Sequence, residues 1–182
     1  TDSEQENVGF VDITDPSAPV GKGIVSLNGE PTSVSVKGDY AAVGVNTSID
    51  YVNTRGRLDI VQISTMEIVR TIYLGGQPDS VAFSPDGDYI VVAIENERDE
   101  DLGEGIPPQM PAGFVVVVDS KKKDPKNWKR TIVDVTGLDG VGIPEDPEPE
   151  YVDVNTDNIA VVTLQENNAI VLIDCATKTV LN

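Results

Sequence analysis

Hydrophobic and polar residues alternate along most of the chain in short runs that are rich in Val, Ile and Thr. Runs of this kind, and short fully apolar runs, are typical of β-strands when Gly, Pro, Asn or Asp bounds them. Turn sequences such as PDGD at 85–88 and KGD at 37–39 provide the residues that tight hairpins need. Helical periodicity is nearly absent. The pattern therefore predicts an all-β chain of short antiparallel strands.

The strand-like runs belong to a repeat. Segments of a first kind place Val three residues after a Pro and end a later run in Asn; they are 29–46, 76–96 and 147–167. Segments of a second kind follow them, and one more precedes the first Pro; they are 9–27, 56–74, 113–135 and 168–182. Together they predict fourteen strands. Four short strands per repeat, with Pro31 and Pro78 about 47 residues apart, are typical of the blades of a β-propeller.

We therefore predict that residues 1–182 form part of one β-propeller domain with about three and a half four-stranded antiparallel blades. The predicted parts are the last two strands of a blade at 9–27, blades at 31–74 and 78–135, long loops at 97–112 and 136–149, and a further blade at 150–182. Propellers have about four to eight blades, so we interpret the chain as an incomplete ring and expect about six to eight blades in the full protein.

The charge narrows the choice of partners. Thirteen Lys and Arg stand against 31 Asp and Glu, which gives a net charge of −18. Such a surface repels phosphate backbones and anionic lipid, so we expect no nucleic-acid partner. No apolar run approaches the roughly 20 residues of a membrane span, so we expect no direct membrane insertion. The charge favours cations or a basic partner.

Two residue counts exclude several kinds of chemistry. The chain has no His, which excludes Ser-His-Asp catalysis and His-bound zinc within this chain. Its single cysteine, Cys175, excludes an internal disulfide framework, and its apolar surroundings indicate a small buried residue. We name no catalytic residue.

Both long loops are acidic and are expected on one face. In a four-stranded blade, the connection between the second and third strands emerges on the same face as the connection to the next blade, because each antiparallel strand reverses direction. The candidate metal ligands in these loops are Glu95, Glu97, Asp99, Glu100, Asp101, Glu104, Glu145, Asp146, Glu148 and Glu150. Calcium takes about six to eight oxygen ligands, so we hypothesise that Ca²⁺ is bound here. The alternative is a solvated acidic rim.

Three Asn residues, Asn46, Asn96 and Asn167, each end the second strand of a repeat. A residue that recurs in every blade is best interpreted as a cap or a turn partner. Asn46 also begins the tripeptide Asn-Thr-Ser, so we mark it as a candidate glycosylation site on a predicted loop.

The basic residues are concentrated in one turn. Six of the thirteen positive charges lie within ten residues: Lys121, Lys122, Lys123, Lys126, Lys129 and Arg130. The turn is expected on the face opposite the acidic loops. It is either a solvated hairpin or a surface that docks against the acidic face of another copy. Trp128 beside it either packs between blades or anchors an interface.

A family resemblance adds to this interpretation. The runs VVTLQENNAIVLIDCATKTVLN and GGQPDSVAFSPDG resemble the YVTN-type propeller repeat. That repeat implies the fold and occurs in surface-layer, phytase-like and other secreted proteins. The runs GFVDITDPSAP, GEPTSV, ENERDEDLG and PEDPEPEYVDVN resemble a group of secreted or cell-surface propellers. The group includes the mesenchyme-specific cell-surface glycoproteins of biomineralising tissue and bacterial proteins labelled alkaline phosphatase or esterase-like phytase.

Two functions follow as expectations. The first is a non-catalytic binding or scaffold module, extracellular or on the cell surface, that binds Ca²⁺. Its partner would be a protein or a glycan, another copy, or the remaining blades. The second, which the resemblance implies, is a Ca²⁺-dependent phosphoesterase in which metal-bound water attacks a phosphomonoester. This chemistry needs cationic side chains on the acidic face, where the sequence places Arg55, Arg57 and Arg98.

Overall fold

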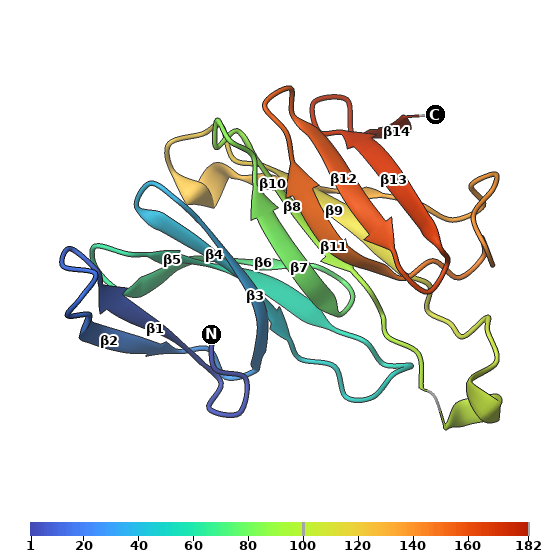
Figure 1. Cartoon of the computed structure of the whole chain (residues 1–182), viewed down its shortest axis with the longest axis horizontal. Coiled ribbons are helices and arrows are strands. Elements are labelled where there is room, and N and C mark those ends of the chain that lie inside the picture. Colours follow the sequence, from blue (N-terminus) through green and yellow to red (C-terminus); the bar gives the residue numbers. More distant parts are fainter. Residues whose placement is uncertain (100, 182) are drawn as a thin grey trace.

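The computed structural model of the chain describes residues 1–99 and 101–181. It contains the fourteen predicted strands in four antiparallel sheets (Figure 1). The first sheet has two strands, β1 (Asn7–Asp12) and β2 (Val20–Ser26). The described residues form no α-helix, only two 3₁₀ turns, η1 (Leu102–Gly105) and η2 (Pro125–Asn127). None of these helical turns is long and apolar enough to cross a membrane.

The other three sheets have four strands each, in sequential order. Blade I consists of β3 (Glu30–Lys37), β4 (Tyr40–Asn46), β5 (Gly56–Gln62) and β6 (Glu67–Tyr73). Blade II consists of β7 (Pro78–Phe83), β8 (Tyr89–Ile94), β9 (Phe114–Asp119) and β10 (Lys129–Val133). Blade III consists of β11 (Pro149–Val154), β12 (Ile159–Leu164), β13 (Ala169–Asp174) and β14 (Thr179–Leu181). This is the β-propeller segment that the repeat predicts.

The hydrophobic core is divided into layers between successive sheets. One cluster joins β1 and β2 to blade I, a second joins blade I to blade II, and a third joins blade II to blade III. Strands at the middle of the stack are buried on both faces; all six residues of β8 are buried. Trp128 belongs to the second cluster, where its ring meets Tyr40 edge to face and its Nε1 donates to the Lys122 carbonyl. Of its two predicted roles, Trp128 therefore has the packing role.

The first strands of the blades, β3, β7 and β11, lie next to one another and line the inner side of the stack (Figure 1). Serine side chains connect them. The hydroxyl of Ser33 accepts a hydrogen bond from the backbone N–H of Val81 at 3.1 Å. Ser80 repeats the contact one blade further, accepting from Val152 N at 3.3 Å. The repeat thus fixes the register between neighbouring blades as well as the strands within each blade.

A glycine at the first residue of the third strand, or directly before it, makes close packing between blades possible. Gly56 in blade I lies against Pro78 of blade II, and Gly113 lies against Pro149 of blade III. A Cβ atom at Gly113 would come within 2.5 Å of the Ile94 carbonyl oxygen. Only glycine fits at this position, because the atoms on the other side belong to the backbone and to a ring.

Candidate functional site

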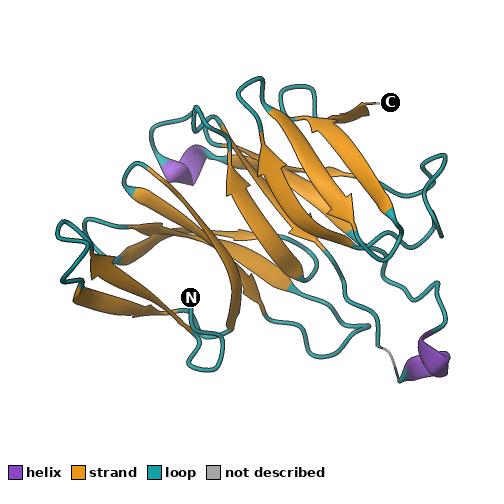
Figure 2. Ribbon diagram, in the orientation of Figure 1, coloured by secondary structure: helices purple, strands orange, loops and turns teal. Residues whose placement is uncertain are grey.

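The two long connections of blade II emerge on one face, as expected. The 95–113 loop joins β8 to β9 and carries η1 at its tip, and the 134–148 loop joins β10 to β11 (Figure 2). They meet where the backbone N–H of Gly113 donates to the Pro147 carbonyl at 2.9 Å. We call the face that carries these loops the acidic face.

A half-buried arginine holds the two loops together. The Arg98 Nε donates to Asp146 Oδ2 at 2.9 Å and lies 3.2 Å from Glu148 Oε1. Its Nη2 donates to the Asp146 carbonyl at 3.0 Å, and its backbone N–H donates to Glu148 Oε1 at 3.1 Å. The side chain of Asp146 is 1% exposed and that of Glu148 is 4% exposed. Two of the predicted calcium ligands therefore pair with a cation that the chain itself supplies.

Gln109 adds to the contacts that Arg98 makes between the two loops. Its backbone N–H donates to Asp146 Oδ2 at 2.8 Å, and its side-chain amide exchanges hydrogen bonds with the backbone of Asp99. The amide thereby closes the 95–113 loop on itself while the loop is fixed to its neighbour. Sequence analysis considered Arg98 only as a phosphate ligand and overlooked Gln109.

Four of the ten predicted ligands do converge. Glu95, Glu97, Glu148 and Glu150 line one cavity of about 270 Å³, together with Arg98, Gly105 and Glu166. Asp99, Asp101, Glu145 and Asp146 do not line it. Asp99 accepts a hydrogen bond from the backbone of Asp101 in the same loop, and Asp101 and Glu145 are exposed. Glu100 and the side chain of Glu104 lie outside the described residues.

The repeat explains why carboxylates gather here. Asp79 and Glu150 occupy the same position of blades II and III, directly after the Pro that begins the inner strand. Glu95 and Glu166 likewise share a position, directly before the recurring Asn. Sequence analysis overlooked Glu166, which lines the cavity, and Asp79, whose charge acts on Glu95 and Glu150, although aligning the repeats residue by residue would have identified both. A repeated position becomes a row of like charges when blades stack side by side.

Burial and mutual repulsion raise the pKa values of four carboxylates here: Asp79, Glu95, Glu148 and Glu150. Desolvation, then the charges of Asp79, Glu97 and nearby glutamates, raises the pKa of Glu95 to about 8. Desolvation also raises the pKa of Glu148 to about 7, although the Arg98 charge acts to lower it. The pKa values of Asp79 and Glu150 are raised for the same two reasons, burial first. Glu95 therefore keeps its proton up to about pH 8, because ionising the whole group would place more negative charge in the cavity than its surroundings compensate.

These shifts predict that stability falls as pH rises from 5 to 8.5. Between the ordinary glutamate pKa of 4.5 and the folded value of about 8, folded Glu95 keeps a proton that the unfolded chain has released. The unfolded state then binds fewer protons, so the free energy of unfolding decreases with pH. Urea unfolding at the two pH values measures this.

Two variants show how much the cavity contributes to this pH dependence of stability. Glu95→Gln is expected to flatten the pH dependence, because the amide does not titrate. Glu4→Gln changes an exposed residue that does not line the cavity, so it is expected to leave the pH dependence of stability unchanged. Equal stability of the unmodified protein at both pH values would contradict the assignment.

The recurring asparagines hold the turns between blades. Asn96 accepts the backbone N–H of Gln77 at 2.9 Å, and Asn167 accepts that of Glu148 at 2.9 Å. Each amide also donates to loop carbonyls. These contacts support the structural interpretation. Asn46 differs, because its Oδ1 accepts from the backbone of Ser48 and its Nδ2 donates to Glu30. Its glycosylation stays a prediction.

The basic turn between β9 and β10 lies away from these loops, as expected. All six of its cationic residues are exposed, and none lines the cavities described above. Lys121 lies over the Tyr89 ring, 4.4 Å from its centroid. The choice between a solvated hairpin and a docking surface stays open.

No metal group is assembled in the part of the chain that the structure describes. Among residues 1–99 and 101–181, no three Asp, Glu or Cys side chains are arranged to hold one ion. Cys175 is buried, and desolvation raises the pKa of its thiol to about 11. The glutamates line the same cavity, but in this structure their carboxylate oxygens are not arranged around a common point where one ion could bind.

Similarity to solved structures supports the fold. The β-propeller domain of Cps50 (Swd1) from Myceliophteria thermophila is 13% identical, with a TM-score of 0.63 over 96% of this chain and 51% of that one. The chain therefore spans about half the length of that propeller. Kuenenia stuttgartiensis hydrazine synthase is 14% identical over 96% of this chain and 60% of its own, with a TM-score of 0.47. A functionally unknown protein from Desulfotomaculum acetoxidans is 10% identical over 100% and 63%, with a TM-score of 0.45. The last two scores are too low to relate the folds.

Sequence comparison defines the family. No protein of curated function matches the chain. The finer resemblance to YVTN-type repeats and to phytase-like proteins stays a prediction. A family model, the choice-of-anchor I domain, matches residues 1–182. The chain therefore belongs to the choice-of-anchor I domain family.

Proposed function

We propose that this chain is part of a non-catalytic binding module at the cell surface, and that it binds a cationic ligand on the acidic face. The observation that carries the proposal is one cavity lined by carboxylates from two adjacent blades, three of which, Glu95, Glu148 and Glu150, have raised pKa values. A bound cation would compensate this charge. The family name, which refers to anchoring, supports a location at the cell surface.

Calcium is the first candidate ligand. Glutamate and aspartate oxygens are its preferred ligands, and long glutamate side chains can turn toward a bound ion. Glu95, Glu97 and Glu150 are the residues to which we assign it, because Glu148 is already paired with Arg98. Binding would draw these side chains from their present separate positions to a common point.

The same arrangement does not favour the phosphoesterase alternative. A phosphate ligand needs cationic groups beside the metal. Arg98 is the one Lys or Arg that lines the carboxylate cavity within the described residues, and it is engaged by Asp146 and Glu148. We therefore propose binding without turnover.

Calorimetric titration of Ca²⁺ into the full-length protein tests this proposal. We expect saturable binding, and we expect Glu95→Gln combined with Glu150→Gln to weaken it at least tenfold. Asp101→Asn, which changes an exposed carboxylate outside the cavity, is the matched control and is expected to bind normally. Release of phosphate from a phosphomonoester, measured in parallel, would favour the enzyme instead. Absence of binding at millimolar Ca²⁺ would contradict the calcium assignment.

A further inference from the structure

The turn that joins the first sheet to blade I contains an asparagine followed by a glycine. Asn28 and Gly29 connect β2 to β3, and they are the only Asn-Gly pair in the sequence. Asn28 has a φ of 50°, in the left-handed region of the backbone. Asparagine tolerates this conformation better than most residues, because its short polar side chain is not crowded there. The turn therefore favours asparagine at its first position.

Close packing requires a glycine at the second position. A Cβ atom at Gly29 would lie 2.9 Å from both Val45 Cγ1 and Thr47 Cγ2. It would also lie 3.0 Å from the backbone oxygen of Asn46. A larger residue would therefore force the turn away from the end of β4. The fold thus places an asparagine and a glycine next to each other for reasons of structure.

Such a pair can react with itself. The backbone nitrogen of the glycine attacks the side-chain amide carbon of the asparagine, a C–N bond forms, and ammonia leaves as a five-membered succinimide closes. Water then opens the ring: attack at the side-chain carbonyl gives aspartate, and attack at the main-chain carbonyl gives isoaspartate. The reaction needs a mobile side-chain amide, an available backbone N–H and no bulky side chain on the second residue. Asparagine is for this reason among the thermolabile residues.

The surroundings of Asn28 meet all three requirements. Its side chain is exposed, and no group within residues 1–99 and 101–181 forms a hydrogen bond with its amide. Across the same described residues, the Gly29 N–H donates to no carbonyl and to no side chain. The nitrogen that attacks and the carbon that it attacks therefore belong to adjacent residues, and no other contact holds either of them away.

Other asparagines of the chain lack one or more of these conditions. Three have amides that are held by hydrogen bonds to neighbouring groups: Asn46, Asn96 and Asn167. Asn168 is the best internal comparison, because it is exposed and has a φ of 51°. The residue after it, Ala169, carries a methyl group and lies in the ladder between β12 and β13. We therefore expect Asn168 to react more slowly than Asn28.

We propose that Asn28 is a site of spontaneous deamidation, at which the folded chain converts this asparagine to aspartate and isoaspartate. The site lies outside the proposed function and needs no bound ligand. Water is the co-reactant, ammonia is the group that leaves, and nothing is oxidised or reduced. Each event adds one negative charge to the turn beside Glu30.

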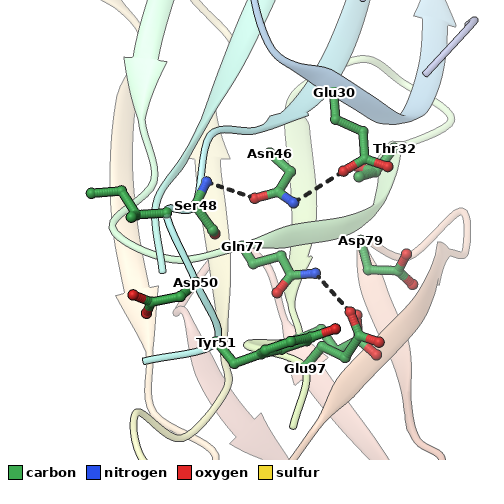
Figure 3. Close-up of a pocket in the computed structure, with 11 residues that line it drawn as sticks. Glu30, Thr32, Asn46, Ser48, Asp50, Tyr51, Gln77, Asp79 and Glu97 are labelled. Atoms are coloured by element: carbon green, nitrogen blue, oxygen red, sulfur yellow. Dashed lines mark hydrogen bonds between the residues drawn. The ribbon is translucent and has the colours of Figure 1, made fainter. Parts of the chain in front are cut away.

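The modified turn is anchored on both sides. Before it, the N–H of the buried Leu27 donates to the Glu6 carbonyl at 2.8 Å, and the Leu27 carbonyl accepts from the Arg57 guanidinium. After it, Glu30 begins β3 and accepts from Asn46 Nδ2 at 3.2 Å (Figure 3). Isoaspartate adds one carbon atom to the main chain between these anchors, so we expect it to loosen the junction between the first sheet and blade I. Aspartate adds only charge.

Peptide mapping of the folded protein after incubation at 37 °C and pH 8 tests the proposal. By mass spectrometry, we expect the peptide that contains Asn28 to change from amide to acid at least tenfold faster than the peptide that contains Asn168. Both products are expected, and a protein isoaspartyl methyltransferase, used as a probe, labels the isoaspartate. A synthetic peptide of residues 25–31 sets the time scale. Retention of the Asn28 amide while this peptide converts would overturn the proposal, and equal rates at the two asparagines would overturn the role of Gly29.

Two variants separate the reaction from its consequence. Asn28→Ser has no side-chain amide, so its peptide is expected to keep its mass during the incubation. Asn28→Asp carries the added charge on a main chain of normal length, and we expect its urea midpoint to stay close to that of the fresh protein. The isoaspartate fraction of the aged protein is expected to unfold at a lower urea concentration. Equal midpoints of this fraction and the fresh protein would overturn the effect assigned to the junction.

Discussion

Replacing Arg98 with Met is expected to lower the free energy of unfolding by about 3–5 kcal/mol. The substitution keeps the apolar volume of the side chain but removes the cation that pairs with Asp146 and Glu148. Both carboxylates are almost fully buried, so each would lose its charged partner without gaining water. Breaking one side of a buried ion pair leaves an uncompensated charge, which is among the largest single-residue effects on stability. Urea unfolding monitored by circular dichroism measures the change.

Two comparisons show whether the loss comes from the buried charges. Lys22→Met breaks the ion pair between Lys22 and Asp12, whose two side chains are 50% and 34% exposed. Because water screens an exposed pair, we expect the urea midpoint to stay nearly unchanged. Adding Asp146→Asn to Arg98→Met removes one stranded charge and is expected to recover part of the loss. Equal, small effects of Arg98→Met and Lys22→Met would show that the two loops are not held together by this pair.

Substituting Gly113 with Ala is expected to lower the free energy of unfolding by roughly 1–3 kcal/mol or more. The new methyl group would lie 2.5 Å from the Ile94 carbonyl oxygen and 2.6 Å from that of Glu95, and it would also meet the Pro149 ring. Backbone atoms of β8 and the start of β11 cannot move aside independently, so blades II and III would have to separate slightly. Thermal and urea unfolding both report the loss.

Gly21→Ala provides the matched control for this clash. Gly21 lies in β2, has no atom within 4 Å of the position of a new Cβ and, like Gly113, does not have a positive φ. We expect its substitution to change stability by no more than about 0.5 kcal/mol. A similar loss for both variants would mean that alanine is disfavoured for a reason other than the contact between blades.

The architecture could be predicted from the sequence because a repeat makes each signal appear several times. Pro31, Pro78 and Pro149 each lie at the first or second residue of an inner strand, and each is followed three residues later by a valine on the same strand. Alternating and apolar runs define strands in either case, whether one face is buried, as in β12, or both, as in β8. The number of strands, their grouping into fours and the face that carries the long loops all follow from these local features.

The candidate site was predicted only in part, because side-chain pairing depends on contacts distant in sequence. Asp146 and Glu148 had the composition of metal ligands, but Arg98, 48 residues before Asp146, occupies them. Asp79 joins the site through the stacking of blades, and no acidic run in the sequence includes it. A carboxylate-rich loop indicates where a site lies, whereas the distances between blades decide which carboxylates belong to it.

The pKa of Glu95 tests most directly whether these carboxylates form a binding site for cations. Nuclear magnetic resonance of glutamate labelled with ¹³C at the side-chain carboxyl follows its titration in the intact protein, with Glu95→Gln assigning the signal. We predict a pKa of about 8 without calcium and a lower pKa when Ca²⁺ is present. A pKa near the ordinary value of 4.5 that does not respond to calcium would contradict the account.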